Sequence, residues 1–78
     1  MEEKAYNIIS EHFGIPRAEI SPTMELRHDL NATDLEIADF LQTLEGIFHI
    51  TITKDDAVKL LTVSDILNFL TDHADEIT

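Results

Sequence analysis

Apolar residues fall at helical spacing through residues 2–13, and this pattern predicts a first helix there. Its buried stripe is expected to consist of Ala5, Ile8, Ile9 and Phe13. Gly14 follows directly, as is common for the residue that ends a helix. Pro16 then prevents the helix from continuing, because its ring fixes φ and it has no N–H to donate.

Residues 15–32 are predicted to be a long connection, since Pro16 and Pro22 and their neighbours disfavour a regular helix. Apolar residues recur along this stretch, and we expect them to hold the loop onto the helices: Ile15, Ile20, Met24, Leu26 and Leu30. A structureless loop of this length is unusual in a compact domain and is often functional.

The second helix is predicted to start at Thr33, because Thr33-Asp34-Leu35-Glu36 fits the capping box Thr-x-x-Glu. In that motif the threonine hydroxyl accepts from a backbone N–H three residues on, and the glutamate reaches back. The strongest amphipathic pattern in the chain follows, with apolar residues at Ile37, Leu41, Leu44 and Phe48.

After this helix the alternation in residues 49–53 could form a short strand, but no second strand is available to pair with it. An extended linker is therefore favoured. Thr53 is a plausible N-cap for a short third helix, with Asp55 and Asp56 near its positive end. Thr62, supported by Asp65, can cap a last helix whose inner face would be Val63, Ile66, Leu67 and Leu70.

These elements predict an all-α fold, a small bundle of three longer helices and one short helix with a long loop between the first two. At 78 residues we expect one domain covering residues 1–78. The chain has no cysteine, so neither a disulfide nor a thiolate metal site supports it. Its stability must come from the patterned apolar residues.

The charge is unusual, because 16 Asp and Glu face 5 Lys and Arg and the net charge is −11. This argues against nucleic-acid binding, which requires a basic surface, and favours partners with basic surfaces. No apolar run approaches the roughly 18 residues of a membrane span, and the first residues lack a signal-peptide pattern. We therefore expect a cytoplasmic monomer.

Candidate chemistry is sparse. The four histidines, at positions 12, 28, 49 and 73, have no metal-ligand spacing, and the aspartates do not follow the EF-hand pattern. We find no nucleophile–base pair, metal motif or phosphate-binding loop, so we expect neither a metal site nor a catalytic function.

Several short motifs occur in a familiar order. They are Phe13-Gly14-Ile15, Asp29-Leu30-Asn31-Ala32, the segment from Leu44-Glu45 to Phe48, Ile50-Thr51-Ile52 and Leu61-Thr62-Val63. They resemble the Leu-Gly-Val, Asp-Leu-Gly-Ala, Leu-Glu-x-x-Phe, Ile-x-Ile-Pro and Thr-Thr-Val motifs of the acyl carrier protein family. The resemblance runs without a gap from about Ala5 to Leu70 and implies that family's fold and type of partner.

The chain departs from this family at the motif Asp-Ser-Leu, where it has Thr33-Asp34-Leu35. In the family, the serine hydroxyl is joined by a phosphodiester to 4′-phosphopantetheine, and a carboxylate cannot replace that hydroxyl. We therefore expect no cofactor at Asp34. Its charge could loosely imitate the missing phosphate, or it could simply be a favourable residue for the first turn of a helix.

Thr33 offers a hydroxyl one residue away, but a one-residue shift turns a side chain by about 100° around a helix. Its capping role already explains its presence. The resemblance also implies acidic partner contacts on the second helix, and the candidate partner-binding residues are Glu36, Asp39, Glu45 and Ile47. The acidic pattern is thinner than usual, because Gly46 and Ile47 stand where the family often has glutamates.

The resemblance implies a carrier-like domain that cannot take 4′-phosphopantetheine as written. Such a domain would act by docking on basic surfaces of fatty-acid, polyketide or related biosynthetic enzymes. Two alternatives remain open: a functional carrier loaded at Thr33, and a serine-replaced variant of an ordinary acyl carrier.

Overall fold

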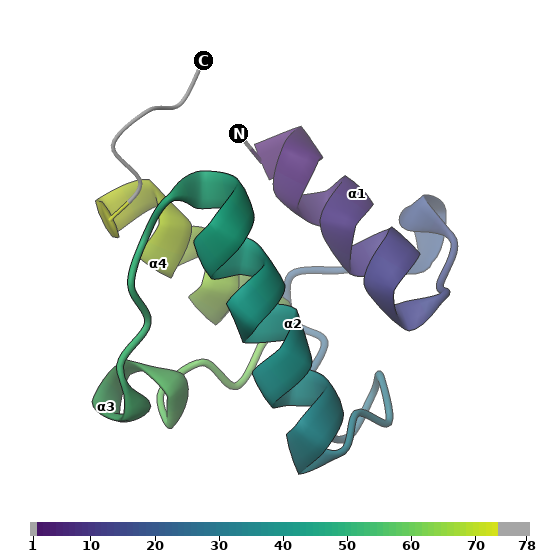
Figure 1. Cartoon of the computed structure of the whole chain (residues 1–78). Helices are drawn as coiled ribbons and strands as arrows, with labels where there is room; N and C mark the ends of the chain where they lie inside the picture. The colour runs from purple at the N-terminus through teal and green to yellow at the C-terminus, as the bar shows by residue number, and fades with distance from the viewer. Residues whose placement is uncertain (1, 74–78) are drawn as a thin grey trace.

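The chain folds into an all-α bundle, as the computed structural model shows for residues 2–73 (Figure 1). Its elements, in order, are α1 (Glu2–Phe13), the 3₁₀ helix η1 (Arg17–Glu19), α2 (Asp34–Phe48), α3 (Lys54–Ala57) and α4 (Val63–His73). The predicted helices are confirmed, including the start of α2 directly after Thr33. Among these helices, none has the length and apolarity needed to cross a bilayer.

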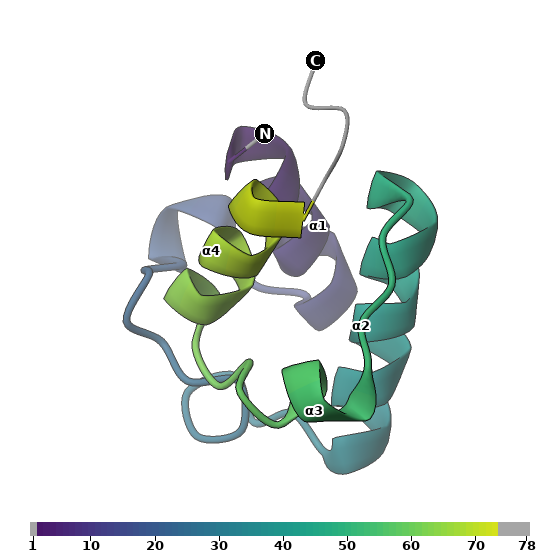
Figure 2. The ribbon, with the colours of Figure 1, turned by 90° about the vertical axis from the view of Figure 1, so that its left-hand side faces the viewer.

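One apolar core lies between α1, α2 and α4 (Figure 2). Phe40 lies at its centre with no exposed surface, and its ring is 5.1 Å from that of Phe13. Phe40 and Tyr6 are buried although the predicted stripes did not include them. The predicted inner faces are otherwise confirmed, with these residues buried: Ala5, Ile9, Ile37, Leu41, Leu44, Phe48, Val63, Ile66, Leu67 and Leu70. Ile8 and Phe13 pack at the edge of the core.

The end of α1 is set by Gly14, which has a φ of +68° that residues with a Cβ rarely adopt. The backbone N–H of Ile15 then donates to the carbonyl oxygen of Ser10 at 3.2 Å and closes the last turn. Pro16 precedes η1, so the prediction that the loop has no regular helix is wrong for three residues. Proline is tolerated here because the first N–H groups of a helix need no partner within it.

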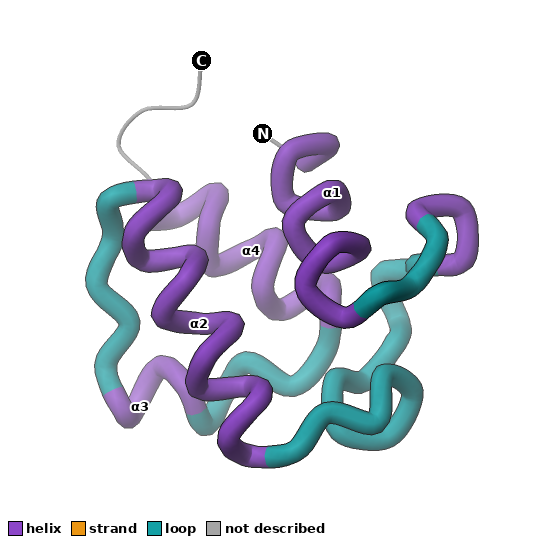
Figure 3. The backbone as a smooth tube through the Cα atoms, turned by 45° about the vertical axis from the view of Figure 1, so that its right-hand side comes forward, coloured by secondary structure: helices purple, strands orange, loops and turns teal. Residues whose placement is uncertain are grey.

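The long loop is held against the beginning of α4 by backbone hydrogen bonds (Figure 3). The N–H of Leu26 donates to the carbonyl of Leu61 at 3.0 Å, and that of Val63 donates to the carbonyl of Met24 at 2.9 Å. An isolated antiparallel bridge joins Glu25 and Thr62 between them. Leu26 is buried, as are Ile20 and Leu30, so the predicted anchoring of the loop is confirmed.

Three helices begin with the same reciprocal cap. The hydroxyls of Thr33, Thr53 and Thr62 accept from the backbone N–H three residues on, at 3.2, 3.1 and 3.1 Å. The carboxylates of Glu36, Asp56 and Asp65 accept in return from the threonine N–H groups, at 2.8, 3.3 and 3.1 Å. Each box satisfies two N–H groups that have no partner inside the helix.

Residues 49–53 form an extended linker that runs back along α2, and the structure has no strand there. His49 ends α2 in the left-handed region with φ 57°. Glu45 reaches across from α2, and its carboxylate accepts from the backbone N–H of Ile52 at 2.6 Å. This contact fixes the linker, and through it the position of α3.

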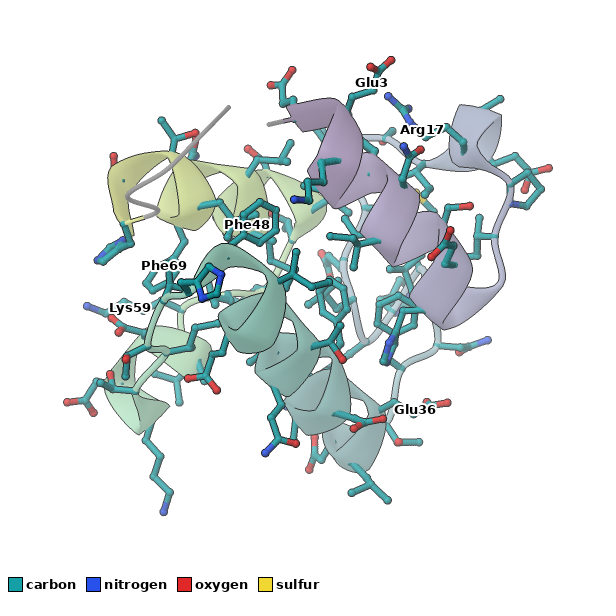
Figure 4. All side chains as sticks on the ribbon, turned by 45° about the horizontal axis from the view of Figure 1, so that its top comes forward. Glu3, Arg17, Glu36, Phe48, Lys59 and Phe69 are labelled. Carbon is teal, nitrogen blue, oxygen red and sulfur yellow. The ribbon has the colours of Figure 1, made fainter. Side chains whose placement is uncertain are left out.

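Two basic side chains lie over aromatic rings and tie elements together. The Arg17 guanidinium lies 4.1 Å from the centre of the Tyr6 ring and holds η1 against α1 (Figure 4). Lys4 places its ammonium 5.5 Å from the centre of the Phe48 ring, which joins α1 to the end of α2. Such contacts are favourable because the ring face carries negative charge.

The cap of α3 makes a testable prediction about Asp56. The Thr53 hydroxyl and then the Thr53 N–H donate to its carboxylate and lower its pKa below the usual 3.8. We expect Thr53→Ala to move this pKa up toward 3.8, as measured by an NMR pH titration of the carboxyl carbon. Thr51→Ala, which changes an exposed linker residue, is the matched control and should leave the titration unchanged.

The sign of the stability effect follows from linkage. Because the folded pKa lies below the unfolded one, Asp56 stabilises the fold fully above 3.8. That contribution is lost as the pH falls through the folded pKa. A Thr53→Ala protein with an unchanged Asp56 titration would contradict the assignment of the shift to this cap.

Candidate functional site

Residue 34 occupies the first turn of α2, where the loop meets the helix. The side chain of Asp34 is 82% exposed, and its carboxylate forms an ion pair with the guanidinium of Arg27, which is 61% exposed. An exposed pair of this kind typically contributes about 0.2–1 kcal/mol. The charge of Asp34 is therefore partly neutralised within the chain, which weakens the interpretation that it imitates a phosphate.

Thr33 caps α2, and its hydroxyl is already in use. The oxygen accepts from the N–H of Glu36 at 3.2 Å, while the Glu36 carboxylate accepts from the N–H of Thr33 at 2.8 Å. Both side chains are exposed, and Figure 4 shows Glu36 projecting from the first turns of α2. The predicted capping box is confirmed.

The turn before α2 explains one departure from the family motif. Asn31 has φ 56°, in the left-handed region where the family pattern carries glycine. Asparagine tolerates this conformation better than most residues with a side chain. Ala32 is buried, and its N–H donates to the carbonyl of Leu26 at 3.0 Å, so the backbone leading to residue 34 is fixed.

A groove of about 370 Å³ lies between α2 and α3, and Leu35 in the first turn of α2 is among the residues that line it. Figure 2 shows α3 beside α2, with the linker descending between them. The groove has an apolar lining with polar groups among it, and its lining includes Leu35, Leu41, Ile52, Ala57, Asp39 and Glu45. An apolar floor with a few charged groups is typical of a recognition surface.

The four candidate partner-binding residues do not form one cluster. Asp39 and Glu45 line the α2–α3 groove, and Glu36 lies in the cap at the start of α2. Glu45 is only half-exposed, because its carboxylate binds the N–H of Ile52. Of the three side chains, Asp39 and Glu36 are the more exposed, and the Glu36 carboxylate also accepts from the N–H of Thr33.

Ile47 lies on the other side of α2. It lines a second hollow of about 270 Å³ between α1 and α2, together with Ile8, Glu11, His12 and Thr43. Ile47 and Glu45 are two residues apart and therefore about 200° apart around the helix. The solvent face of α2 thus separates Ile47 from the α2–α3 groove. One flat partner surface does not reach both sides equally.

Exposed apolar side chains were missed by the sequence reasoning. Leu35 is 79% exposed in the first turn of α2 and lines the groove, while Val58 and Leu61 are 70% and 56% exposed beyond α3. Of these three residues, only Leu35 could have been recognised as exposed from the sequence, because it lies off the predicted apolar stripe of α2. Apolar groups left in water beside a groove favour docking over catalysis.

The chemistry at position 34 does not fit an attached phosphopantetheine group. Attachment requires a hydroxyl oxygen that can form a phosphodiester, and Asp34 offers a carboxylate held by Arg27. Across residues 2–73, no cluster of three or more His, Asp or Glu side chains is arranged to hold a metal ion. The arrangement can present charged and apolar groups to a partner.

Comparison with known proteins gives a consistent result. Residues 3–70 match the family described as "Phosphopantetheine attachment site". The solution structure of the apo doublet acyl carrier protein from prodigiosin biosynthesis is similar, with a TM-score of 0.80 and 18% sequence identity. That match covers 99% of this chain and 37% of the other chain, so this chain spans little more than a third of that protein. At this identity the likeness shows the fold.

The capping role of Thr33 can be tested by substitution. Thr33→Ala removes an acceptor for the Glu36 N–H and should reduce the free energy of unfolding by about 0.5–2 kcal/mol. Thr33→Asp should retain most of the stability, because aspartate also caps and favours the positive helix end. Urea denaturation of both variants measures this, and an Ala variant as stable as the parent would refute the capping role.

Proposed function

The chain belongs to the phosphopantetheine attachment-site family of non-catalytic carrier domains, and on that premise we propose that it is a carrier-like docking domain. In this proposal it does not take 4′-phosphopantetheine at position 34. It acts by docking to basic surfaces of fatty-acid, polyketide or related biosynthetic enzymes. The observation that carries the proposal is the carboxylate of Asp34, paired with Arg27, at the attachment position.

The loading step depends on the nucleophile. Loading requires an alcohol oxygen to attack a phosphate of coenzyme A and leave a stable phosphodiester. A carboxylate in that position would give at best a mixed anhydride, which water cleaves readily. The ion pair with Arg27 further engages one of the two carboxylate oxygens, Oδ1. The fold is therefore kept while the loading step is lost.

Charge and exposure together favour docking through α2. A net charge of −11 attracts basic partners over a distance, and complementary charge mainly accelerates and orients encounters. Glu36 and Asp39 are exposed on α2, and Leu35 adds an exposed apolar contact beside the groove. We propose this part of α2 as the primary docking surface, with Glu45 and Ile47 as candidate contacts on either side.

Two other functions remain to be separated by experiment. Thr33 has an exposed hydroxyl, which favours testing it as a displaced loading site, although that hydroxyl already accepts from the Glu36 N–H. A serine-replaced variant of an ordinary carrier would have the same fold and the same docking surface. The first alternative predicts that the parent chain is loaded, whereas the second, like the main proposal, predicts that only Asp34→Ser is.

We predict that Asp34→Ser restores loading. The variant supplies the missing hydroxyl, and the loop and α2 around it retain their geometry. The measurement is intact mass after incubation with coenzyme A and a broad-specificity phosphopantetheinyl transferase. The parent should gain no mass and the variant should gain one phosphopantetheine group. Loading of the parent that disappears in Thr33→Ala would instead assign the site to Thr33.

We also predict that Asp39 contributes to docking of the transferase. In the Asp34→Ser background, Asp39→Lys should lower kcat/KM for loading roughly threefold or more, because it places a positive charge opposite a basic partner. Glu19→Lys makes the same change in net charge in the exposed η1 helix and is the matched control. Equal losses in both variants would mean that only overall charge matters.

A further inference from the structure

Gly46 is a glycine that the packing of the fold does not require. It lies in α2 and is exposed. A Cβ built on it meets no atom within 4 Å in the part of the chain that the structure describes, its own helix backbone and chain neighbours apart. Glycine destabilises a helix relative to alanine, because it loses more backbone freedom on folding. It does, however, allow another molecule to approach the backbone closely.

We propose that a partner helix crosses α2 at Gly46. The partner is an amphipathic helix with apolar side chains on one face and lysine or arginine beside them. The bare backbone lets its axis come closer to α2 than a side chain at this position would allow. This inference rests on the proposed function in taking α2 as the docking element, and it adds the shape and chemistry of the partner.

The residues around Gly46 form a hole of the kind that receives a side chain from a packed helix. Its four corners follow the spacing i, i+3, i+4 and i+7, and they are Asp39, Gln42, Thr43 and Gly46. Three of these residues are exposed, and Thr43 is half-buried. Because one corner has no side chain, an apolar side chain of the partner can enter the hole deeply.

Hollows on both sides of α2 make a crossing helix a better fit than a flat surface. Figure 1 shows α2 between α1 and α3. The α2–α3 groove of about 370 Å³ lies on one side, and the hollow of about 270 Å³ between α1 and α2 lies on the other. The exposed face of α2 is a ridge between them, and Gly46 is a low point of that ridge. A helix that crosses there can extend apolar side chains into the groove and toward Ile47, which is 36% exposed.

The charges beside this ridge favour a basic partner. Carboxylates line both hollows, with Asp39 and Glu45 in the α2–α3 groove and Glu11 in the hollow between α1 and α2. Lys54 also lines the groove, on its α3 side. The net charge of −11 nevertheless makes the surroundings strongly negative. Lysine or arginine at the edges of the partner's apolar face can pair with these carboxylates, which repel an acidic helix.

The test uses a synthetic probe helix and the isotope-labelled parent chain. The probe is a peptide of leucine and lysine whose leucines follow helical spacing, and its charge control is the same peptide with glutamate in place of lysine. In an NMR titration the leucine–lysine peptide should shift the amide signals of Gln42, Gly46, Ile47 and Ile8. The leucine–glutamate peptide should bind roughly tenfold or more weakly, because it meets like charge.

Gly46→Leu separates this inference from general stickiness of the surface. An exposed leucine ordinarily adds apolar contact, but here it fills the hole, so the Kd for the leucine–lysine peptide should rise roughly tenfold or more. The melting temperature of the free variant should rise, because leucine favours a helix more than glycine does. Asn68→Leu adds the same side chain to the exposed face of α4 and is the matched control, which should not weaken binding.

Three results would overturn the inference. The first is a Gly46→Leu protein that binds the leucine–lysine peptide as tightly as the parent does. The second is a titration that leaves the signals around Gly46 unchanged. The third is tighter binding of the leucine–glutamate peptide, which would indicate an acidic partner such as a second copy of this chain. Failure of the proposed function would show instead as loading of the parent chain, which these binding measurements do not involve.

Discussion

Backbone hydrogen bonds between residues 22–26 and 61–64 hold the long loop in place, and the position of residue 34 depends on them. Buried backbone groups need partners, and this loop has little secondary structure to provide them. The beginning of α4 supplies those partners through Leu61, Val63 and Ser64. The loop consequently delivers a fixed turn, with Arg27 and Asn31 in defined positions, to the start of α2.

Acidic side chains stabilise turns and helix starts in this fold as well as giving it charge. Carboxylates of Asp29, Glu36, Glu45, Asp56 and Asp65 each accept a backbone N–H at a turn or helix start. Lys4, Arg17 and Arg27 also make contacts within the chain. Self-repulsion of the acidic surface is thus partly offset by local bonds, while Asp39 remains open on α2.

Local patterns predicted the helices and their caps well, because a capping box or an apolar stripe depends only on residues that are close in the sequence. Thr33 with Glu36 is one such case, and Gly14 is another. Two other contacts each join residues that are seven positions apart across a loop. One is the ion pair between Arg27 and Asp34, and the other is the hydrogen bond from the Ile52 N–H to the Glu45 carboxylate. Their geometry depends on how the loop packs. Sequence reasoning also grouped Ile47 with Asp39 and Glu45, although the structure places Ile47 on another side of α2 from the groove that Asp39 and Glu45 line.

The three capping boxes also bear on the order in which the chain folds. Each closes within four residues, so a helix start can form on the fast timescale of local contacts. The bonds between Leu26 and Leu61 join segments far apart in the chain and require a large loop to close first. We therefore expect helices to form before the loop is fastened to α4, so that the turn carrying Arg27 becomes ordered late in folding.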